Sequence, residues 1–369
     1  MKLICSKANL LNGVNTVSKA VPNKTTMSIL ECILIDASEN KIKLIANDTE
    51  LGIETVVTGI IEEKGKIALD AKILLDIVRK LPDSDVTIEC DSSLKTYINC
   101  GKAKFTIIAK PADEFTYLPD IERIDSISVS QFTLKEIIRQ TIFSIADNDN
   151  NKIMTGELFE VSGDVLKVVS LDGHRISIRK INLKTSYPQK KVIVPGKTLN
   201  EISKILSGDT EKEVKIFFTG KHIIFEFDET VVVSRLIEGE FFKIDQMLSS
   251  DYETKLTINK KELLDSIDRA TLLVKEGDKK PIIINILDEN IELKMNSTVG
   301  SMNEEISVTK QGKDIMIGFN PKFMLDALRV IDDEEIDIYF VNPKAPCFIK
   351  NSEESYIYMV LPVNFTTVS

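Results

Sequence analysis

Two short stretches of this 369-residue chain hold residues that could do chemistry. In the first, the segment PGKT at residues 195–198 follows a run of β-forming residues and precedes a helical pattern, as the end of a phosphate-binding loop does. Such a loop needs a glycine five residues before its Gly-Lys-Thr, so that backbone N–H groups surround the phosphates, but Lys191 stands there. Pro195 also lacks a backbone N–H. These features argue against a nucleotide site, although an enzyme that uses this segment stays open as an alternative.

The second stretch is SLDGHRIS at residues 170–177, where Asp172 and His174 could form an acid–base pair. No nucleophile motif lies near them, and the chain has only two histidines and no H-E-x-x-H helix. The same residues are also typical of a turn in which Gly173 adopts a positive φ angle. We therefore expect no catalytic residue, no cofactor and no metal site, while catalysis by Asp172 and His174 stays open as an alternative.

Composition and charge indicate a soluble globular protein, since 43% of the residues are hydrophobic and 28% are charged. No apolar run approaches the roughly 20 residues of a membrane helix, and we expect no signal peptide. The cysteines form no C-x-x-C pair, which favours free thiols in a reducing cytoplasm; they are Cys5, Cys32, Cys90, Cys100 and Cys347. The net charge of −10 argues against nucleic-acid binding unless the basic residues are concentrated on one surface.

A repeat explains the PGKT segment. Six segments combine a short β-like run, a capping residue and an amphipathic helix, and they start at Lys2, Lys66, Ser126, Lys191, Lys255 and Asp314. The first core residues of the six helices are Leu10, Leu74, Leu134, Leu199, Leu263 and Met324, at intervals of 64, 60, 65, 64 and 61 residues. Regular recurrence of this kind outweighs a single local motif.

The capping residues support the alignment of the repeats. Four residues before each first core residue stand Ser6, Asp70, Ser130, Pro195, Asn259 and Asn320. Five of these side chains can accept a hydrogen bond from the free N–H groups of a first helical turn, and proline is tolerated at a helix start. The PGKT segment is therefore predicted to be a helix start.

Strand patterns follow each helix, so one repeat reads as strand–helix–strands. Such a unit has one apolar helix face and cannot bury it alone, whereas two units back to back place two helices inside and two sheets outside. The sequence thus predicts an α+β fold with three similar domains of two repeats each, at residues 1–122, 123–250 and 251–369. The linkers are expected at residues 118–126 and 248–255.

Basic residues recur at two positions of the helices, two and nine residues after the cap. The first position holds Ala8, Lys72, Phe132, Lys197, Lys261 and Lys322, and the second holds Asn15, Arg79, Arg139, Lys204, Asp268 and Arg329. Both positions lie far from the apolar stripe around the helix axis. Solvated helix faces often carry lysine and arginine, but the same phase in several helices of an acidic chain favours a shared basic surface.

The number of helices suggests an assembly. If helices about 10 Å apart line a closed ring with their basic faces inward, six nearly close the hole, and twelve leave a hole of about 28 Å that admits duplex DNA. Six helices per chain then imply a homodimer. A basic hole inside an acidic exterior holds phosphates without reading bases.

The whole chain resembles the bacterial DNA sliding clamps, the β subunit of DNA polymerase III. The segments that carry the resemblance are SLDGHRIS, PADEF at 111–115, EGEFFKIDQML at 238–248, IGFNPKFMLDAL at 317–328 and YMVLPV at 358–363. The resemblance implies the DNA clamp fold, a head-to-tail homodimeric ring with helices lining the hole, and a non-catalytic processivity function in the cytoplasm. The implied partners are a second copy, double-stranded DNA, an ATP-driven clamp loader, and the replicative polymerase and repair proteins with clamp-binding peptides, with no membrane. A monomeric scaffold of the same fold stays open as an alternative.

The resemblance also implies three sets of site residues. It supports Lys24, Arg79, Lys152 and Lys197 as DNA contacts, beside Lys72, Arg139, Lys204, Lys322 and Arg329 from the helix pattern. It implies a pocket for partner peptides formed by Met154, Leu171, Gly173, His174, Arg175, Ile176, Phe242, Gln246, Met247, Val360, Leu361, Pro362 and Val363. It implies a dimer seam between Lys102, Lys104 and Phe105 of one copy and Leu272 and Leu273 of the other.

The chain departs from the family at the pocket. Phe242 stands where proline is common, and Gln246 stands where some members have arginine. Asn364 replaces a usual arginine, and residues 365–369 extend past the usual end.

Overall fold

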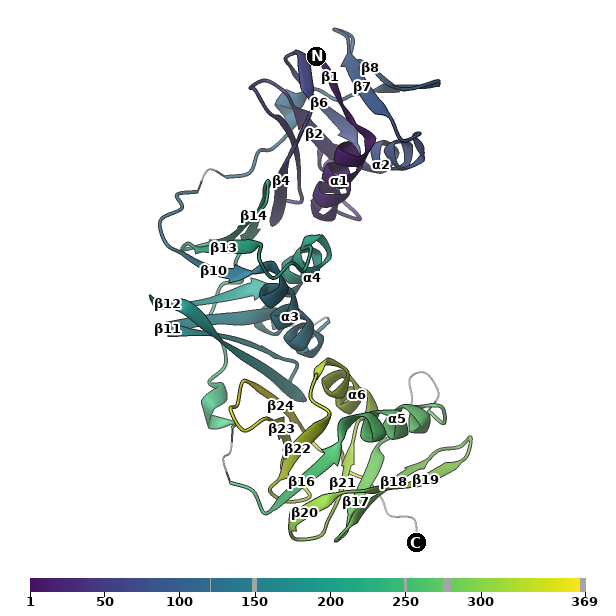
Figure 1. Cartoon of the computed structure of the whole chain (residues 1–369), viewed down its shortest axis with the longest axis vertical. Coiled ribbons are helices and arrows are strands. Elements are labelled where there is room, and N and C mark those ends of the chain that lie inside the picture. The colour runs from purple at the N-terminus through teal and green to yellow at the C-terminus, as the bar shows by residue number, and fades with distance from the viewer. Residues whose placement is uncertain (120, 148–150, 249–250, 275–279, 366–369) are drawn as a thin grey trace. The chain divides into compact units, whose positions relative to one another are not determined.

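The structure is a computed structural model that describes residues 1–119, 121–147, 151–248, 251–274 and 280–365 (Figure 1). The predicted linkers include Asp120, Ser249 and Ser250, which lie outside the described residues. Contacts divide the chain into two compact units. Unit 1 holds Met1–Lys135 and Lys197–Leu236, and unit 2 holds Glu136–Gly196 and Ile237–Ser369.

Six α-helices begin where the caps predict, within the part of the chain that the structure describes. They are α1 (Lys7–Val17), α2 (Ala71–Lys80), α3 (Gln131–Thr141), α4 (Gly196–Ile205), α5 (Lys260–Thr271) and α6 (Pro321–Val330). All five polar caps accept a backbone N–H at 2.8–3.2 Å: Ser6 from Asn9, Asp70 from Ile73, Ser130 from Thr133, Asn259 from Glu262, and Asn320 from Lys322. The PGKT segment is the start of α4, as predicted. None of the described helices is long and apolar enough to cross a membrane.

The core positions of the helices are also confirmed. The six predicted first core residues are at most 1% exposed, which places each at the centre of a buried face. Helix α1 is thus defined by its cap Ser6 and its first core residue Leu10. Helices α5 and α6 are defined in the same way, by the caps Asn259 and Asn320 and the first core residues Leu263 and Met324.

Unit 1 contains two sheets of antiparallel pairs. The five-stranded sheet has the order β5 (Ile60–Glu63), β1 (Lys2–Ser6), β7 (Asp85–Cys90), β8 (Lys95–Cys100) and β9 (Ala103–Ile108). The eight-stranded sheet has the order β10 (Ser126–Ser130), β13 (Glu213–Phe218), β14 (His222–Phe227), β15 (Thr230–Arg235), β4 (Leu51–Val57), β3 (Ile42–Asn47), β2 (Cys32–Asp36) and β6 (Lys66–Asp70). Strands β7 and β8 alternate between buried and more exposed residues, the pattern of a sheet with one face on a core.

Unit 2 contains two further sheets. The seven-stranded sheet has the order β11 (Gly156–Leu171), β12 (Arg175–Pro195), β24 (Tyr356–Val360), β23 (Cys347–Lys350), β22 (Glu335–Phe340), β16 (Thr254–Asn259) and β20 (Thr309–Gly312). The four-stranded sheet has the order β19 (Ser301–Ser307), β18 (Asn290–Asn296), β17 (Ile282–Ile286) and β21 (Ile315–Phe319). Strand β12 includes the β-like run predicted before α4 and begins well before it, at Arg175.

Helices lie between sheets within each unit, as predicted (Figure 1). In unit 1, α1 packs against α2 and contacts β1 of one sheet and β3 and β4 of the other. In unit 2, α5 packs against α6 and contacts β16 of one sheet and β18 and β19 of the other. The apolar helix faces are therefore buried between two sheets, as the repeat requires.

Continuous sheets explain why the contacts divide the chain into two units. Strand β15 pairs with β4, with Val232 opposite Ile53, and β12 pairs with β24, with Ile178 opposite Ile357. Backbone hydrogen bonds thus join the middle third of the chain to the first third in unit 1 and to the last third in unit 2. The predicted middle domain is consequently shared between the two units.

A carboxylate lies in the interior of unit 2. Glu157 on β11 is 0% exposed, and neither carboxylate oxygen has a hydrogen-bond partner among the described residues. Burial raises the pKa of Glu157 to about 8. Glu157 is therefore largely protonated at neutral pH in the folded protein.

Candidate functional site

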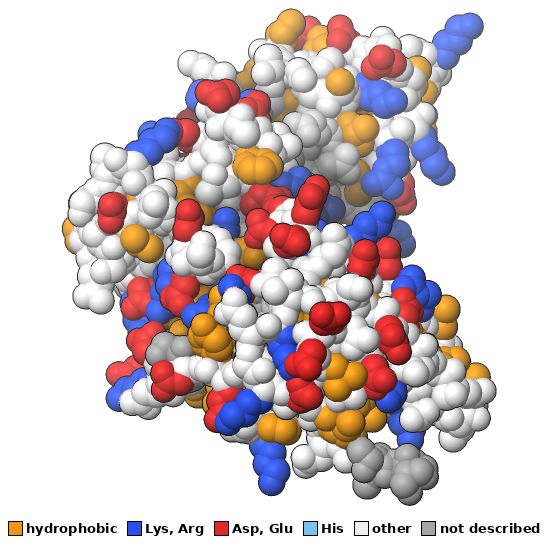
Figure 2. Space-filling view, turned by 60° about the horizontal axis from the view of Figure 1, so that its bottom comes forward, with side chains coloured by type: hydrophobic (Ala, Val, Ile, Leu, Met, Phe, Trp, Pro, Cys, Tyr) orange, Lys and Arg blue, Asp and Glu red, His pale blue; other side chains and the backbone are white. Residues whose placement is uncertain are grey.

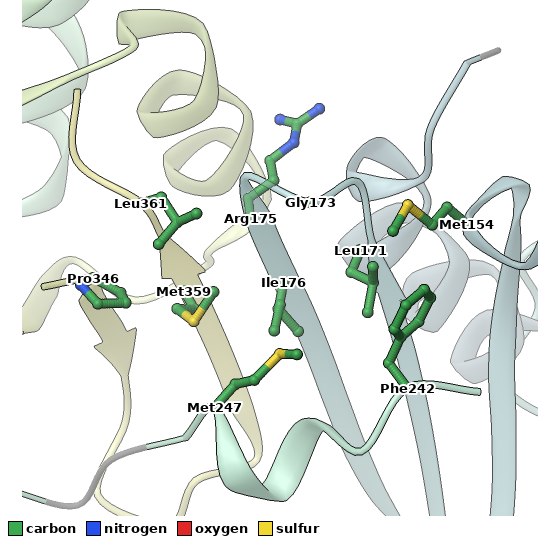
Figure 3. Close-up of a pocket in the computed structure, with 10 residues that line it drawn as sticks. All are labelled: Met154, Leu171, Gly173, Arg175, Ile176, Phe242, Met247, Pro346, Met359 and Leu361. Atoms are coloured by element: carbon green, nitrogen blue, oxygen red, sulfur yellow. The ribbon is translucent and has the colours of Figure 1, made fainter. Parts of the chain in front are cut away.

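An apolar pocket of about 350 Å³ lies in unit 2 (Figure 3). Its walls come from segments far apart in the sequence: η5 (Lys152–Thr155), the β11–β12 turn, the segment around η6 (Ile244–Gln246), the β22–β23 loop and the end of β24. The lining residues are Met154, Leu171, Gly173, Arg175, Ile176, Phe242, Met247, Pro346, Met359 and Leu361. Three of these are methionines, whose flexible side chains adapt to the shape of a bound group. The pocket can therefore receive large apolar side chains.

Strand register produces the floor of the pocket. Leu171 on β11 pairs with Ile176 on β12, which pairs with Met359 on β24. Paired residues point to the same face of a sheet, so these three side chains form one row. Phe242 packs against this cluster from the segment before η6, and Figure 3 shows Met247 directed toward the same row. The row joins β11 and β12 to the last strand of the chain.

The structure brings together eight of the thirteen predicted pocket residues: Met154, Leu171, Gly173, Arg175, Ile176, Phe242, Met247 and Leu361. It places the other five outside this lining, namely His174, Gln246, Val360, Pro362 and Val363. Val360 is 1% exposed and packs in the core around α5 and α6, because it lies on the opposite face of β24 from Met359.

Two lining residues were not predicted. Met359 shares the face of Leu361 by the two-residue period of a strand, so the alternation in YIYMVL could have identified it. Pro346 lies in a loop, and no sequence pattern assigned it to the pocket.

The Asp172–His174 segment is a turn, with Gly173 at φ +84°. The Asp172 Oδ1 atom accepts the backbone N–H groups of His174 and Arg175 at 3.0 and 3.1 Å, and Oδ2 accepts Arg175 Nε at 2.9 Å. The carboxylate thus holds the turn and the arginine. The interpretation of this segment as a turn with Gly173 at a positive φ angle is therefore confirmed.

Arg175 is the centre of a buried polar network. Its side chain is 7% exposed, and it donates from Nη1 to Asp326 on α6 at 2.7 Å and from Nη2 to the Phe143 carbonyl. The guanidinium carbon also lies 4.5 Å from the centre of the Phe323 ring. Arg175 therefore joins β12, the segment after α3, and α6 at the edge of the apolar pocket.

A second pocket of about 350 Å³ in unit 2 shares Arg175 with the apolar pocket. Its lining includes Asp147, His174, Lys322 and Asp326. The His174 ring lies 5.9 Å from the Phe323 ring. His174 and Lys322, which were predicted for different surfaces, thus lie around one cavity.

The predicted DNA contacts differ in how they are paired. All but Arg139 are exposed: Lys24, Lys72, Arg79, Lys152, Lys197, Lys204, Lys322 and Arg329. Four make ion pairs: Lys197 with Asp48, Lys204 with Glu201 at 2.8 Å, Arg329 with Asp268 at 2.9 Å, and Arg139 with both Glu136 at 2.6 Å and Asp332 at 3.2 Å. Acidic and basic side chains are interspersed on the face shown in Figure 2. The helix pattern identified exposed basic positions but not their acidic partners.

The predicted seam residues lie on two separate surfaces. In unit 1, Lys102, Lys104 and Phe105 are exposed on or beside β9, which is an edge strand. In unit 2, Leu272 directly after α5 is 82% exposed, and Leu273 is half-buried. Each surface presents an apolar side chain to solvent.

Known protein families match this chain along most of its length. Three family models match the chain in order: the N-terminal domain of the DNA polymerase III beta subunit at residues 1–119, the central domain at 128–243 and the C-terminal domain at 245–364. A Staphylococcus epidermidis protein named beta sliding clamp is 31% identical over 374 residues, which cover 98% of this chain and 99% of that protein.

Solved structures agree with these matches. A putative DNA polymerase III beta subunit from Eubacterium rectale has a TM-score of 0.97 and 71% identity, covering 99% of this chain and 100% of that chain. The DNA polymerase sliding clamp from Bacillus subtilis has a TM-score of 0.95 and 34% identity, with the same coverage. The chain has the three-domain DNA clamp fold and belongs to the DNA polymerase III beta subunit family.

Proposed function

We propose that this chain is a DNA polymerase processivity factor that closes as a homodimeric ring around duplex DNA, slides along it, and tethers replication and repair proteins. The observation that carries the proposal is the succession of three clamp-domain matches along the chain. The six helices with equivalent starts, five of which carry a basic residue at the shared positions, support it. The protein acts without catalysis, because topology rather than a reaction keeps a ring on DNA.

The proposed domains are residues 1–122, 123–250 and 251–369. The proposed compartment is the cytoplasm, and five buried free cysteines fit a reducing environment. A clamp loader opens the ring, since a closed circle cannot thread onto DNA without ends.

The proposed DNA contacts are basic residues on the helices and nearby turns. Lys72, Arg79 and Lys322 are exposed on their helices, and Lys24 and Lys152 are exposed outside them. Lys197, Lys204, Arg139 and Arg329 have carboxylate neighbours that reduce their net attraction for phosphate. Direct affinity for DNA is therefore weak, which suits a ring that must slide.

The proposed seam joins the β9 surface of one copy to the end of α5 in the other. Edge strands present unpaired backbone groups and can extend a sheet with another chain. Phe105 is 38% exposed and Ile108 is 70% exposed on β9, and Leu272 is 82% exposed in the facing surface. Burial of these side chains favours association.

Retention on circular DNA tests the ring. Once loaded, the wild-type protein is expected to stay on a closed circle and to leave when the circle is cut, because only topology holds it. The matched control is Leu273→Asp, which places a charge in the seam and should give monomers that are not retained. Gel filtration of protein–DNA complexes measures retention, and sedimentation measures whether each protein is a monomer. Equal retention on circular and linear DNA would contradict the proposal.

The apolar pocket is the proposed docking site for partner peptides. Its Met, Leu, Ile and Phe side chains suit one or two large apolar anchors, and buried anchors dominate the energy of such interfaces. The rim residues proposed from the family, His174, Gln246, Pro362 and Val363, lie beyond the apolar lining. A short peptide with a glutamine and a Leu-Phe pair is the expected ligand class.

Charge in the pocket should abolish peptide binding. Met247→Asp is expected to weaken the peptide at least about tenfold, because an anchor would desolvate the new carboxylate. Met27→Asp is the matched control, since Met27 and Met247 are 48% and 47% exposed and Met27 lies in unit 1. Fluorescence polarisation of the labelled peptide measures both affinities. A similar affinity for the two variants would place the site elsewhere.

A further inference from the structure

The chain continues past Leu361 as a segment attached at two places. We name residues Leu361–Phe365 the tail strap. The Leu361 N–H donates to the His174 carbonyl at 2.9 Å, and the Val363 N–H donates to the Gly318 carbonyl at 2.8 Å. The first bond ties the strap to the turn that borders the apolar pocket, and the second ties it to strand β21.

Strand β21 is suited to receive the strap. It is an edge strand of the four-stranded sheet, where Gly318 pairs with Ile283 on β17. Its other edge has backbone groups available for a further chain segment, and the Val363 bond uses one of them. The strap is thus bonded to the open edge of this sheet at one position.

Gly318 leaves room for the end of the strap. A Cβ atom on Gly318 would lie 2.6 Å from Phe365 Cδ1 and 2.9 Å from the Val363 carbonyl oxygen. Both distances are shorter than a real Cβ contact, so the close approach of the strap depends on glycine at this position. Phe365 is half-buried although it lies near the chain end.

The strap carries a wall of the pocket between its two attachments. Leu361 lines the apolar pocket, and Pro362 follows it with a fixed φ angle and no N–H to satisfy. Freeing a segment of backbone restores conformational entropy that a bound peptide must then remove. The position of Leu361 therefore depends on how firmly the strap is held beyond it.

We infer that Phe365 is a positioning residue: its ring docks on Gly318 and thereby holds Leu361 in place as a wall of the partner-peptide pocket. The inference rests on the proposed peptide-binding function for its consequence, but the docking itself is independent of any peptide. Phe365 acts through Leu361 and does not reach the pocket lining.

A double-mutant cycle tests the inference. Phe365→Ala is expected to weaken the peptide about fivefold to tenfold, and Gly318→Ala is expected to do the same because its methyl group displaces the ring. The double variant should be no weaker than either single variant, since both remove one contact. Phe365→Tyr keeps the ring and should bind like wild type. Fluorescence polarisation gives the affinities, and unchanged dimer mass and thermal midpoint show that the fold is intact.

Amide hydrogen exchange separates the strap from the pocket. The Leu361 and Val363 N–H groups should be protected in wild type, and Val363 should lose protection in Phe365→Ala without any peptide present. If protection is lost and Met247→Asp fails to affect the peptide, the pocket proposal is wrong while the docking stands. Unchanged protection in Phe365→Ala overturns the inference, and so does unchanged affinity in Phe365→Ala when Met247→Asp weakens the peptide. A tighter peptide would also overturn it, because the strap would then be an obstacle.

Discussion

Replacing Glu157 with glutamine is expected to stabilise the protein by about 3 kcal/mol at pH 7. The folded protein holds Glu157 with a pKa of about 8, against an ordinary value of 4.5. Below pH 4.5 the carboxyl group is protonated in both states and contributes no difference. Between pH 4.5 and about 8 the unfolded chain releases a proton that the folded chain retains, so the free energy of unfolding falls by about 1.4 kcal/mol per pH unit. Above pH 8 both states are ionised and the loss is constant.

Denaturant unfolding over pH 5–9 measures this difference. Glutamine is neutral at every pH and similar in size, so the Glu157→Gln variant should lack the wild-type decline that this group causes. The stability gap between the two proteins should widen up to about pH 8 and then level off. Glu240→Gln is the matched control, because Glu240 is exposed in the same unit. A gap that is the same at pH 5 and pH 8 would refute a buried, protonated Glu157.

Removal of the Arg175 side chain is expected to destabilise unit 2 by about 3–5 kcal/mol, the range for breaking a buried ion pair from one side. Arg175→Ala leaves the carboxylates of Asp172 and Asp326 without their cation. Their side chains are 14% and 19% exposed, so water replaces the lost partner only in part. Arg175→Lys should recover part of the loss, because an ammonium group cannot reproduce the three directions in which this guanidinium donates.

Arg329→Ala is the matched control, because Arg329 lies on α6, the helix that carries the Asp326 partner of Arg175. Arg329 pairs with Asp268 at 2.9 Å, but their side chains are 54% and 56% exposed. An exposed pair of this kind contributes at most about 1 kcal/mol. The loss of unfolding free energy, measured by thermal and denaturant unfolding, should therefore be severalfold larger in Arg175→Ala than in Arg329→Ala. Equal effects would mean that burial does not distinguish the two arginines.

Local patterns predicted the helices well because each helix start is set by nearby residues. The side chains of Asn259 and Asn320 bond to N–H groups two or three residues ahead, so the cap and its partner lie in one short window. The burial of Leu263 and Met324 follows from the same window through helical periodicity. Such features depend little on the rest of the chain.

The site was predicted less completely because it depends on pairings between distant strands. Whether Met359 or Val360 faces the pocket is decided by the register of β24 against β12. Likewise, Arg139 was assigned to a basic surface, but its neighbour Asp332 comes from beyond α6. Glu157 is a charged residue type beside apolar residues on β11, and the local sequence does not show that its side chain is buried with theirs.

The position of β24 in its sheet has a consequence for biosynthesis. This strand is the last of the described strands, yet it lies between β12 and β23 and pairs with both. While the ribosome is still making the C-terminal segment, β12 has no partner on that side and presents an open edge. The seven-stranded sheet can therefore be completed only after β24 has left the ribosome, so newly made protein passes through a stage in which that edge is vulnerable to aggregation and to chaperone capture.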